Sequence, residues 1–271
     1  MRIPWRIILR ISREVRGLLK LIKIEFKKLH RRPFILLAAM AAIILPVPIS
    51  VLAAKTGQGY DFLFKTVINI GHFVLLIPVL CIVSAMLFLE ERDNNTLKAL
   101  LTIPVSSNKL AGAKLFILLV ISVLFSIFAY IATLCGSFVG QMQVEQIGSK
   151  LLISIIMGVM TWVASLPCIA VVVGLSKNYI FSVLISFVYA ILGFIITSST
   201  LPQAIPNLLM IFPVNVINRW LIPYFQELQT ADYPFDIAPC IVNTPLCVMY
   251  LMLYTVVCSS LICYNFKRWE Q

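Results

Sequence analysis

The chain has 271 residues, of which 61% are hydrophobic and only 12% are charged, and its formal net charge is +11. A composition this apolar excludes a water-soluble globular protein and predicts an integral membrane protein. The seven cysteines form no CxxC pair and the two histidines lie far apart, so we expect neither a metal site nor a redox site.

Residues 1–32 hold 11 of the 22 lysines and arginines. At about 100° per residue, ten of these cations share one helical arc and eleven apolar residues fill the opposite arc. The pattern predicts a basic amphipathic helix that lies on the anionic inner leaflet of a membrane. A nucleic-acid-binding arm is the alternative, but such an arm does not need regularly spaced apolar residues, so no nucleic-acid partner is expected.

Six apolar segments follow, and each has about the 20 residues that a helix needs to cross lipid. The predicted fold class is therefore all-α, a polytopic membrane protein whose residues 33–271 form one six-span domain. The predicted spans are 33–54, 66–89, 115–140, 151–175, 179–198 and 245–264.

The distribution of basic residues predicts the orientation of these spans. With a cytoplasmic N-terminus, the inner segments hold 18 lysines and arginines and the outer segments hold four. Cytoplasmic loops are enriched in these residues, so both termini are expected to be cytoplasmic.

The longest external segment, 199–244, is rich in proline and aromatic residues. Its pieces 205–212 and 214–225 are too short to span, and we expect them to dip into the outer interface or to lie along it. On this basis alone, Trp220, Tyr224 and Phe225 are interpreted as interfacial anchors. Cys240 and Cys247, near the same face, are close enough in sequence for a disulfide bridge to be considered.

No charged residue falls inside the six predicted spans, and His72 is interpreted as a helix-packing residue near the outer face. Intramembrane charges mark ion and proton paths, so their absence disfavours a proton-driven carrier. Backbone carbonyls at helix breaks could still hold an ion, which keeps a secondary carrier as an alternative. No GxxxxGK[ST] motif occurs, so the chain is not expected to hydrolyse ATP or to be an enzyme.

The loop 90–114 is the most informative cytoplasmic segment. Leu97, Leu100 and Leu101 share one face at helical spacing, and Pro104 ends this short helix. Two turns of helix are not stable alone in water, so the apolar face needs a groove to fill. The groove belongs either to another protein or to the chain's own spans and lipid headgroups.

The loop sequence EERDNNTLKALLTIPVSSNKLAGAK resembles the signature that joins the second and third spans of type-2 (ABC-2) ABC exporter permeases. Residues 18–29 resemble the amphipathic elbow that opens these permeases. The resemblance implies that Glu90 and Glu91 cap the base of the second span and that residues 201–225 form re-entrant outer helices. It also implies a coupling helix that contacts an ATPase through Thr96, Leu97, Leu100, Leu101, Ile103 and Pro104.

The resemblance further implies a permease subunit of the bacterial cell membrane, paired with two cytoplasmic ABC ATPases and with a second permease chain, identical or homologous. ATP and magnesium would bind to the ATPases, and this chain would carry no cofactor. The absence of a large external domain is similar to bacitracin and lantibiotic self-protection permeases, which implies an amphipathic peptide substrate met by Trp220, Tyr224 and Phe225. A secondary carrier, and a non-transporting membrane scaffold or sensor, are the alternatives.

Overall fold

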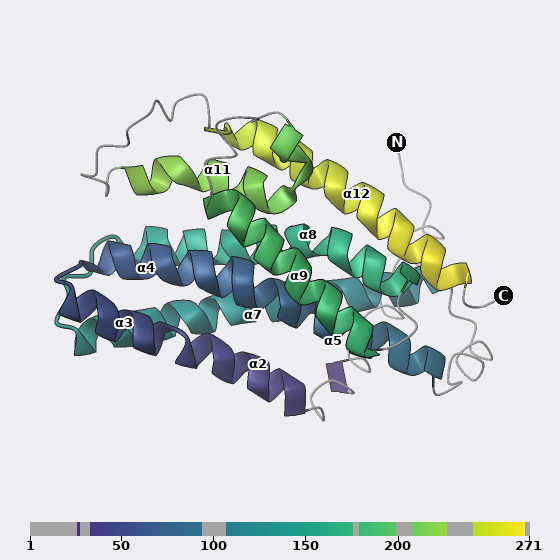
Figure 1. Ribbon diagram of the computed structural model, residues 1–271, viewed down its shortest axis with the longest axis horizontal. Coiled ribbons are helices and arrows are strands. Elements are labelled where there is room, and N and C mark those ends of the chain that lie inside the picture. The colour runs from purple at the N-terminus through teal and green to yellow at the C-terminus, as the bar shows by residue number, and fades with distance from the viewer. Residues whose placement is uncertain are drawn as a thin grey trace, which may run out of the picture.

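The computed structural model is a bundle of long helices (Figure 1). It describes residues 26–27, 33–93, 107–175, 179–198, 208–226 and 241–268, and all statements below concern these residues. Six helical stretches in this part of the chain are long and apolar enough to cross a membrane. The prediction of an all-α, six-span membrane protein is confirmed, whereas the amphipathic helix predicted for residues 1–32 lies almost entirely outside the described residues.

The first two spans are not single regular helices. The first consists of α2 (Pro33–Ile44) and α3 (Pro46–Lys55), interrupted at Leu45. Because Pro46 lacks a backbone N–H, the regular hydrogen-bond ladder cannot continue through it. The second span runs through α4 (Tyr60–Ile68), the π-helical segment η1 (Asn69–Leu76) and α5 (Ile77–Asp93).

The remaining spans are continuous helices: α7 (Ser107–Val139), α8 (Ile147–Leu175), α9 (Tyr179–Ser198) and α12 (Thr244–Arg268). The fifth span has the predicted bounds, whereas α7 begins eight residues before its predicted span and the second span begins six residues early. Between α9 and α12 lie the short 3-10 helix η2 (Leu208–Ile211) and α11 (Pro213–Gln226), which packs on α8, α9 and α12.

The helices alternate in direction, so the bundle has two ends (Figure 1). At one end α5 finishes, α7 begins, and α8 and α12 finish; we call it the predicted cytoplasmic end. At the opposite end, the predicted outer end, α3 finishes, α4 and α8 begin, and α7 finishes. Since α2 begins and α12 finishes at the same end, the helix order agrees with termini on one side of the membrane.

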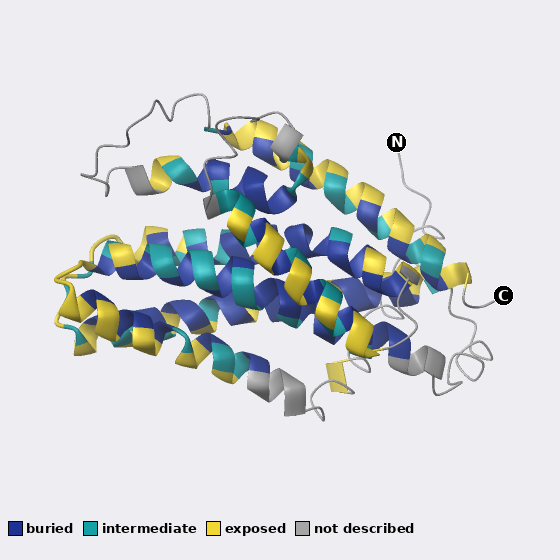
Figure 2. Cartoon of the chain, in the orientation of Figure 1, coloured by how far each residue is buried: buried dark blue, intermediate teal, exposed yellow. Residues whose placement is uncertain are grey.

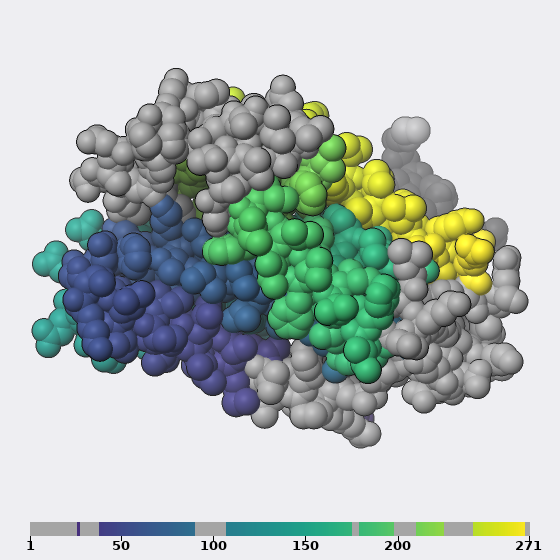
Figure 3. Space-filling view, viewed as in Figure 1, coloured from purple at the N-terminus to yellow at the C-terminus, as the bar shows by residue number. Residues whose placement is uncertain are grey.

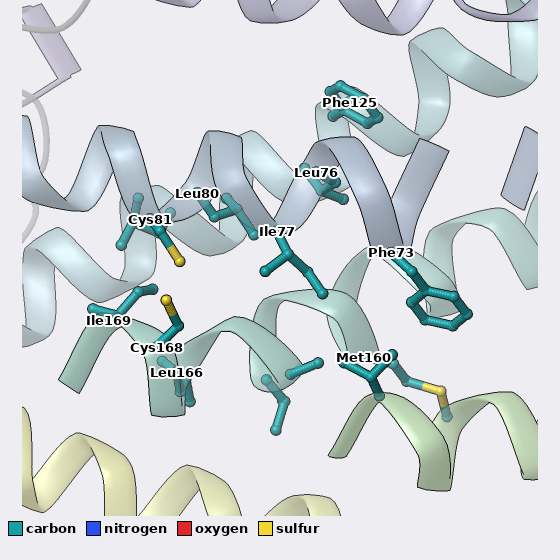
Figure 4. Packing of buried hydrophobic residues seen from close by; sticks show 14 of the residues in the cluster. Phe73, Leu76, Ile77, Leu80, Cys81, Phe125, Met160, Leu166, Cys168 and Ile169 are labelled. Atoms are coloured by element: carbon teal, nitrogen blue, oxygen red, sulfur yellow. The ribbon is translucent and has the colours of Figure 1, made fainter. Parts of the chain in front are cut away.

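Helix α8 lies at the centre of the bundle, where it contacts α5, α7 and α12. Figure 4 shows part of this core, in which Cys81 of α5 and Cys168 of α8 turn their sulfur atoms toward each other. By contrast, α9 and α12 expose apolar faces along their length (Figure 2). Figure 3 shows α9 on the surface, between the α2–α3 span and α12. Exposed apolar faces of this extent are expected where helices meet lipid.

Candidate functional site

The segment predicted to couple to an ATPase lies between α5 and α7 at the predicted cytoplasmic end. Helix α5 finishes at Asp93 and α7 begins at Ser107, and residues 94–106 fall outside the described part of the chain. The last turn of α5 contains Glu90 and Glu91, whose side chains are not described. The predicted coupling residues outside the described part are Thr96, Leu97, Leu100, Leu101, Ile103 and Pro104.

Lys114 joins three helices close to this loop. Its side chain is 0% exposed, and its ammonium group donates a hydrogen bond to the backbone carbonyl of Leu87 in α5. The same Nζ atom lies 4.9 Å from the ring centroid of Phe88 and 5.2 Å from that of Phe266 in α12. The two rings meet edge to face, with centroids 5.5 Å apart and an angle of 79° between their planes. Lys114 therefore connects α5, α7 and α12.

The sequence places Lys114 in the buried stripe of α7. Leu110 lies four residues before it, Leu118 lies four residues after it, and both are buried. Side chains four residues apart share one helix face, so a lysine here must enter the core. Hydropathy alone places Lys114 in the cytoplasmic loop 90–114, whereas its spacing from the two leucines indicates burial.

A second buried lysine lies at the predicted outer end. Lys150, in the first turn of α8, forms an ion pair with Asp61 in the first turn of α4. Its Nζ atom is 4.6 Å from the ring centroid of Tyr60. The Tyr60 ring stacks on Phe64 at 6.2 Å, and Phe64 meets Tyr130 of α7 edge to face at 6.0 Å. This cluster connects α4, α7 and α8 at the predicted outer end, and it was not predicted from the sequence.

The outer segment separates the three aromatic residues predicted to meet substrate. Trp220 is only 5% exposed; its ring centroid is 4.8 Å from that of Tyr224, and its indole Nε1 donates to Thr244 Oγ1 at 3.1 Å. Tyr224 is 45% exposed. The side chain of Phe225 lies outside the described part. The structure therefore leaves Tyr224 accessible and uses Trp220 to pack α11 against the start of α12.

His72 lies in the bundle core rather than near the outer face. It is 1% exposed and its Nε2 atom is 2.9 Å from Ser126 Oγ in α7. Ser122 Oγ donates to the carbonyl of Gly158 in α8 at 2.6 Å, and a Cβ atom at Gly158 would lie 2.6 Å from Ser126 Oγ. A glycine is therefore needed where α7 and α8 approach each other. These polar contacts fix the packing of neighbouring helices.

Among the described residues, no three His, Cys, Asp or Glu side chains gather as a metal site would require. The described residues form a bundle of membrane-length helices in which α5 finishes and α7 begins at the predicted cytoplasmic end. This architecture defines a multi-pass helical membrane protein.

Comparison with known proteins identifies the family within that class. Residues 21–193 match the ABC-2 family transporter protein family, and the chain belongs to this family. The chain is also similar to the bacitracin transport permease protein BCRB of Bacillus licheniformis, with 36% identity over 128 residues. The matched region covers 43% of this chain and 60% of that relative. The family resemblance drawn from the loop 90–114 is thereby confirmed.

Proposed function

We propose that this chain is the permease subunit of an ATP-driven ABC exporter in the bacterial cell membrane, with both termini in the cytoplasm. The observation that carries the proposal is the family match over residues 21–193, which includes the whole loop between α5 and α7. In the proposed complex, two cytoplasmic ATPases bind ATP and magnesium, and a second permease chain, identical or homologous, completes the transport path. This chain performs no covalent chemistry.

In this proposal the short helix at residues 96–103 docks on the ATPase through Leu97, Leu100 and Leu101. Glu90 and Glu91 lie in the last turn of α5, where they would cap the base of the second span. Closure of the ATPase pair on ATP would press on the docked helix. The movement would then enter the membrane along α5 and α7, which bound the loop.

The docking step is tested by co-purification of the chain with its ATPase in mild detergent. Replacing Leu100 and Leu101 by Asp would put unpaired charge into the apolar groove and should abolish ATPase binding while leaving the protein in the membrane. Replacing exposed Asn108 in α7 by Asp is a control for added negative charge outside the apolar face. Normal ATPase recovery with the double variant would refute the coupling assignment.

We further propose that the substrate is an amphipathic peptide antibiotic of the bacitracin or lantibiotic type. Support comes from the similarity to a bacitracin transport permease and from α11, which exposes Tyr224 beside a proline-rich outer segment. Aromatic side chains at the lipid surface suit a partner that is apolar on one side and wet on the other. In this arrangement Tyr224 and Phe225 would meet the peptide, and Trp220 would support Tyr224.

The substrate proposal is tested in a sensitive bacterium that expresses the chain with its ATPase and partner. Inhibitory concentrations are measured for a panel of bacitracin and lantibiotic peptides, with wild type beside Tyr224→Ala and beside Tyr264→Ala, an exposed tyrosine of α12 near the other end. Protection by wild type that Tyr224→Ala reduces and Tyr264→Ala does not is the expected result. An assembled, ATP-hydrolysing complex that protects against no peptide would remove the substrate assignment but not the exporter.

A further inference from the structure

Lys114 occupies a mechanical position between the loop and the last span. It lies seven residues after the start of α7, and its partner Leu87 lies six residues before the end of α5. At 1.5 Å per residue, the contact is about 10 Å from the points where the chain leaves both helices. Residues 87–93 of α5 and residues 107–114 of α7 are continuous helix. A displacement at the loop is therefore carried to Lys114 without an intervening hinge.

The third partner of Lys114 belongs to α12, which is far from the loop in sequence. Phe266 is 0% exposed and lies two residues before the end of that helix. Most of α12 is exposed along the bundle surface, and it packs mainly on α8 and to a smaller extent on α7. Its buried side chains are few, and Phe266 is the one that meets Lys114. Next to Phe266, Asn265 packs so closely on α8 that a Cβ atom at Gly174 would lie 2.6 Å from its amide nitrogen.

We call the contact of Lys114 with Leu87, Phe88 and Phe266 the lysine joint. Its chemistry can keep the three helices together while they move. A buried ammonium group is strongly destabilised if it leaves its partners, because the surroundings offer little solvation. Its hydrogen bond to the Leu87 carbonyl is directional, whereas attraction to the faces of Phe88 and Phe266 varies gently with distance and angle. The joint therefore resists separation of α5, α7 and α12 and tolerates small rotations.

We infer that Lys114 is the positioning residue through which movement of the segment 94–106 reaches α12. The inference rests on the proposed function, because an ATPase must supply that movement. With Lys114 in place, α12 moves together with α7. Without its charge, α7 still follows the loop, but α12 lags behind and the ATPase cycle is poorly converted into movement of the last span.

The test measures movement of α12 relative to α7 in the full complex with the ATPase and the second permease. Nitroxide labels are placed on exposed sites, Phe138→Cys in α7 and Tyr264→Cys in α12, after replacement of the seven native cysteines by alanine. The labelled chain is diluted with unlabelled chain so that distances within one copy dominate. Electron–electron resonance distances are recorded without nucleotide and with ADP and vanadate trapped in the ATPase.

In the wild type we expect the Phe138–Tyr264 label distance to stay constant on trapping, because both helices move as one. With Lys114→Met, which keeps the apolar stem and removes the charge, trapping should shift the distance by about 2 Å or more. Lys114→Arg should behave as the wild type, since a guanidinium also donates to a carbonyl and attracts aromatic faces. Lys267→Met, at an exposed lysine of α12 next to Phe266, is the control and should change nothing.

Phe266→Leu provides a second route, because it removes the α12 half of the joint and leaves the Lys114–Leu87 bond intact. It should also produce a trapping-dependent shift, even if Lys114→Met fails to assemble. If the complex assembles and hydrolyses ATP but both variants keep the wild-type distance on trapping, the inference is overturned and the exporter proposal stands. If the ATPase does not co-purify with the wild type, the proposed function fails, and the inference fails with it.

Discussion

The two ends of the bundle each bury one lysine, but they stabilise it in different ways. At the predicted outer end, Lys150 meets the carboxylate of Asp61, whose side chain is 31% exposed, and lies over the ring of Tyr60. At the predicted cytoplasmic end, Lys114 is fully buried and meets a backbone carbonyl and two phenylalanine rings. One lysine is held at the edge of water, and the other is held inside the protein.

The difference shows how burial selects the partner of a charge. A carboxylate near water attracts an ammonium group strongly enough to hold it, and both groups keep part of their hydration. Deeper in the bundle, the carbonyl oxygen of Leu87 and the faces of two phenylalanine rings provide negative potential around the ammonium group. The outer lysine is therefore expected to respond to salt and to loss of its carboxylate, and the inner lysine to changes in packing.

The contrast between the two lysines depends first on which end of the bundle faces the cytoplasm. Thiol labelling tests this orientation and should give the largest effect. Single cysteines at Gly57, Glu145 and Asp232 should react with an impermeant thiol reagent in intact cells, and a cysteine at Asn95 should react only after lysis. The reason is the excess of lysine and arginine in the segments assigned to the inside. If the cysteine at position 95 reacted in intact cells and the other three did not, the orientation in the membrane would be the reverse of the predicted one.

Removal of the inner lysine side chain should have the next largest effect. Lys114→Ala removes the bond to Leu87, both aromatic contacts and the volume of the stem, so stability should fall by about 2–3 kcal/mol. Lys114→Met keeps the volume and should cost less than about 1 kcal/mol, because it also removes a buried charge.

Thermal unfolding in detergent, followed by tryptophan fluorescence, measures both variants. A fall of roughly 5 °C or more in Tm is expected for the alanine variant alone. Equal losses for alanine and methionine would show that the charge, and not the volume of the stem, dominates the stability at this site.

The sequence predicted the number and order of the spans because about 20 apolar residues in a row have few other uses. It misplaced the beginnings of the second and third spans for a physical reason. Hydropathy assigns charged residues to loops, whereas Asp61 and Lys65 lie in α4 and Lys114 lies in α7. Asp61 pairs with Lys150, and Lys114 donates a hydrogen bond to the carbonyl of Leu87. Partners 27 and 89 residues away along the chain cannot be inferred from local pattern.

Two other features could not be predicted from the sequence for the same reason. The π-helical segment around His72 packs on α7, α8 and α9, and no single segment of sequence encodes these contacts. The burial of Trp220 depends on Thr244 at the start of α12. In contrast, the loop 90–114 indicated the family directly, because its residues resemble the signature that joins the second and third spans of ABC-2 permeases. Its coupling role stays a prediction, since residues 94–106 lie outside the described part.

The outer ion pair should respond to loss of its carboxylate. Asp61→Asn leaves the Lys150 ammonium in place with a weaker acceptor, and stability should fall by about 1 kcal/mol, limited by the access of water to Asp61. Lys150→Met in the same background should recover part of this loss, since the uncompensated charge is then removed. Lys55→Met, at an exposed lysine of α3, serves as the control and should leave Tm unchanged. Additive losses in the double variant would mean that the pair contributes nothing to stability.

The smallest expected effect separates the two lysines most directly. At 1 M KCl the screening length is about 3 Å, so the attraction between Asp61 and Lys150, which water reaches, should weaken. The difference in unfolding free energy between the wild type and Asp61→Asn should then narrow by a few tenths of a kcal/mol compared with 0.05 M KCl. The difference between the wild type and Lys114→Ala should stay the same, because ions do not enter the space between the two phenylalanine rings. If salt reduced both differences equally, the inner lysine would be hydrated, and the contrast between the two ends would be one of position alone.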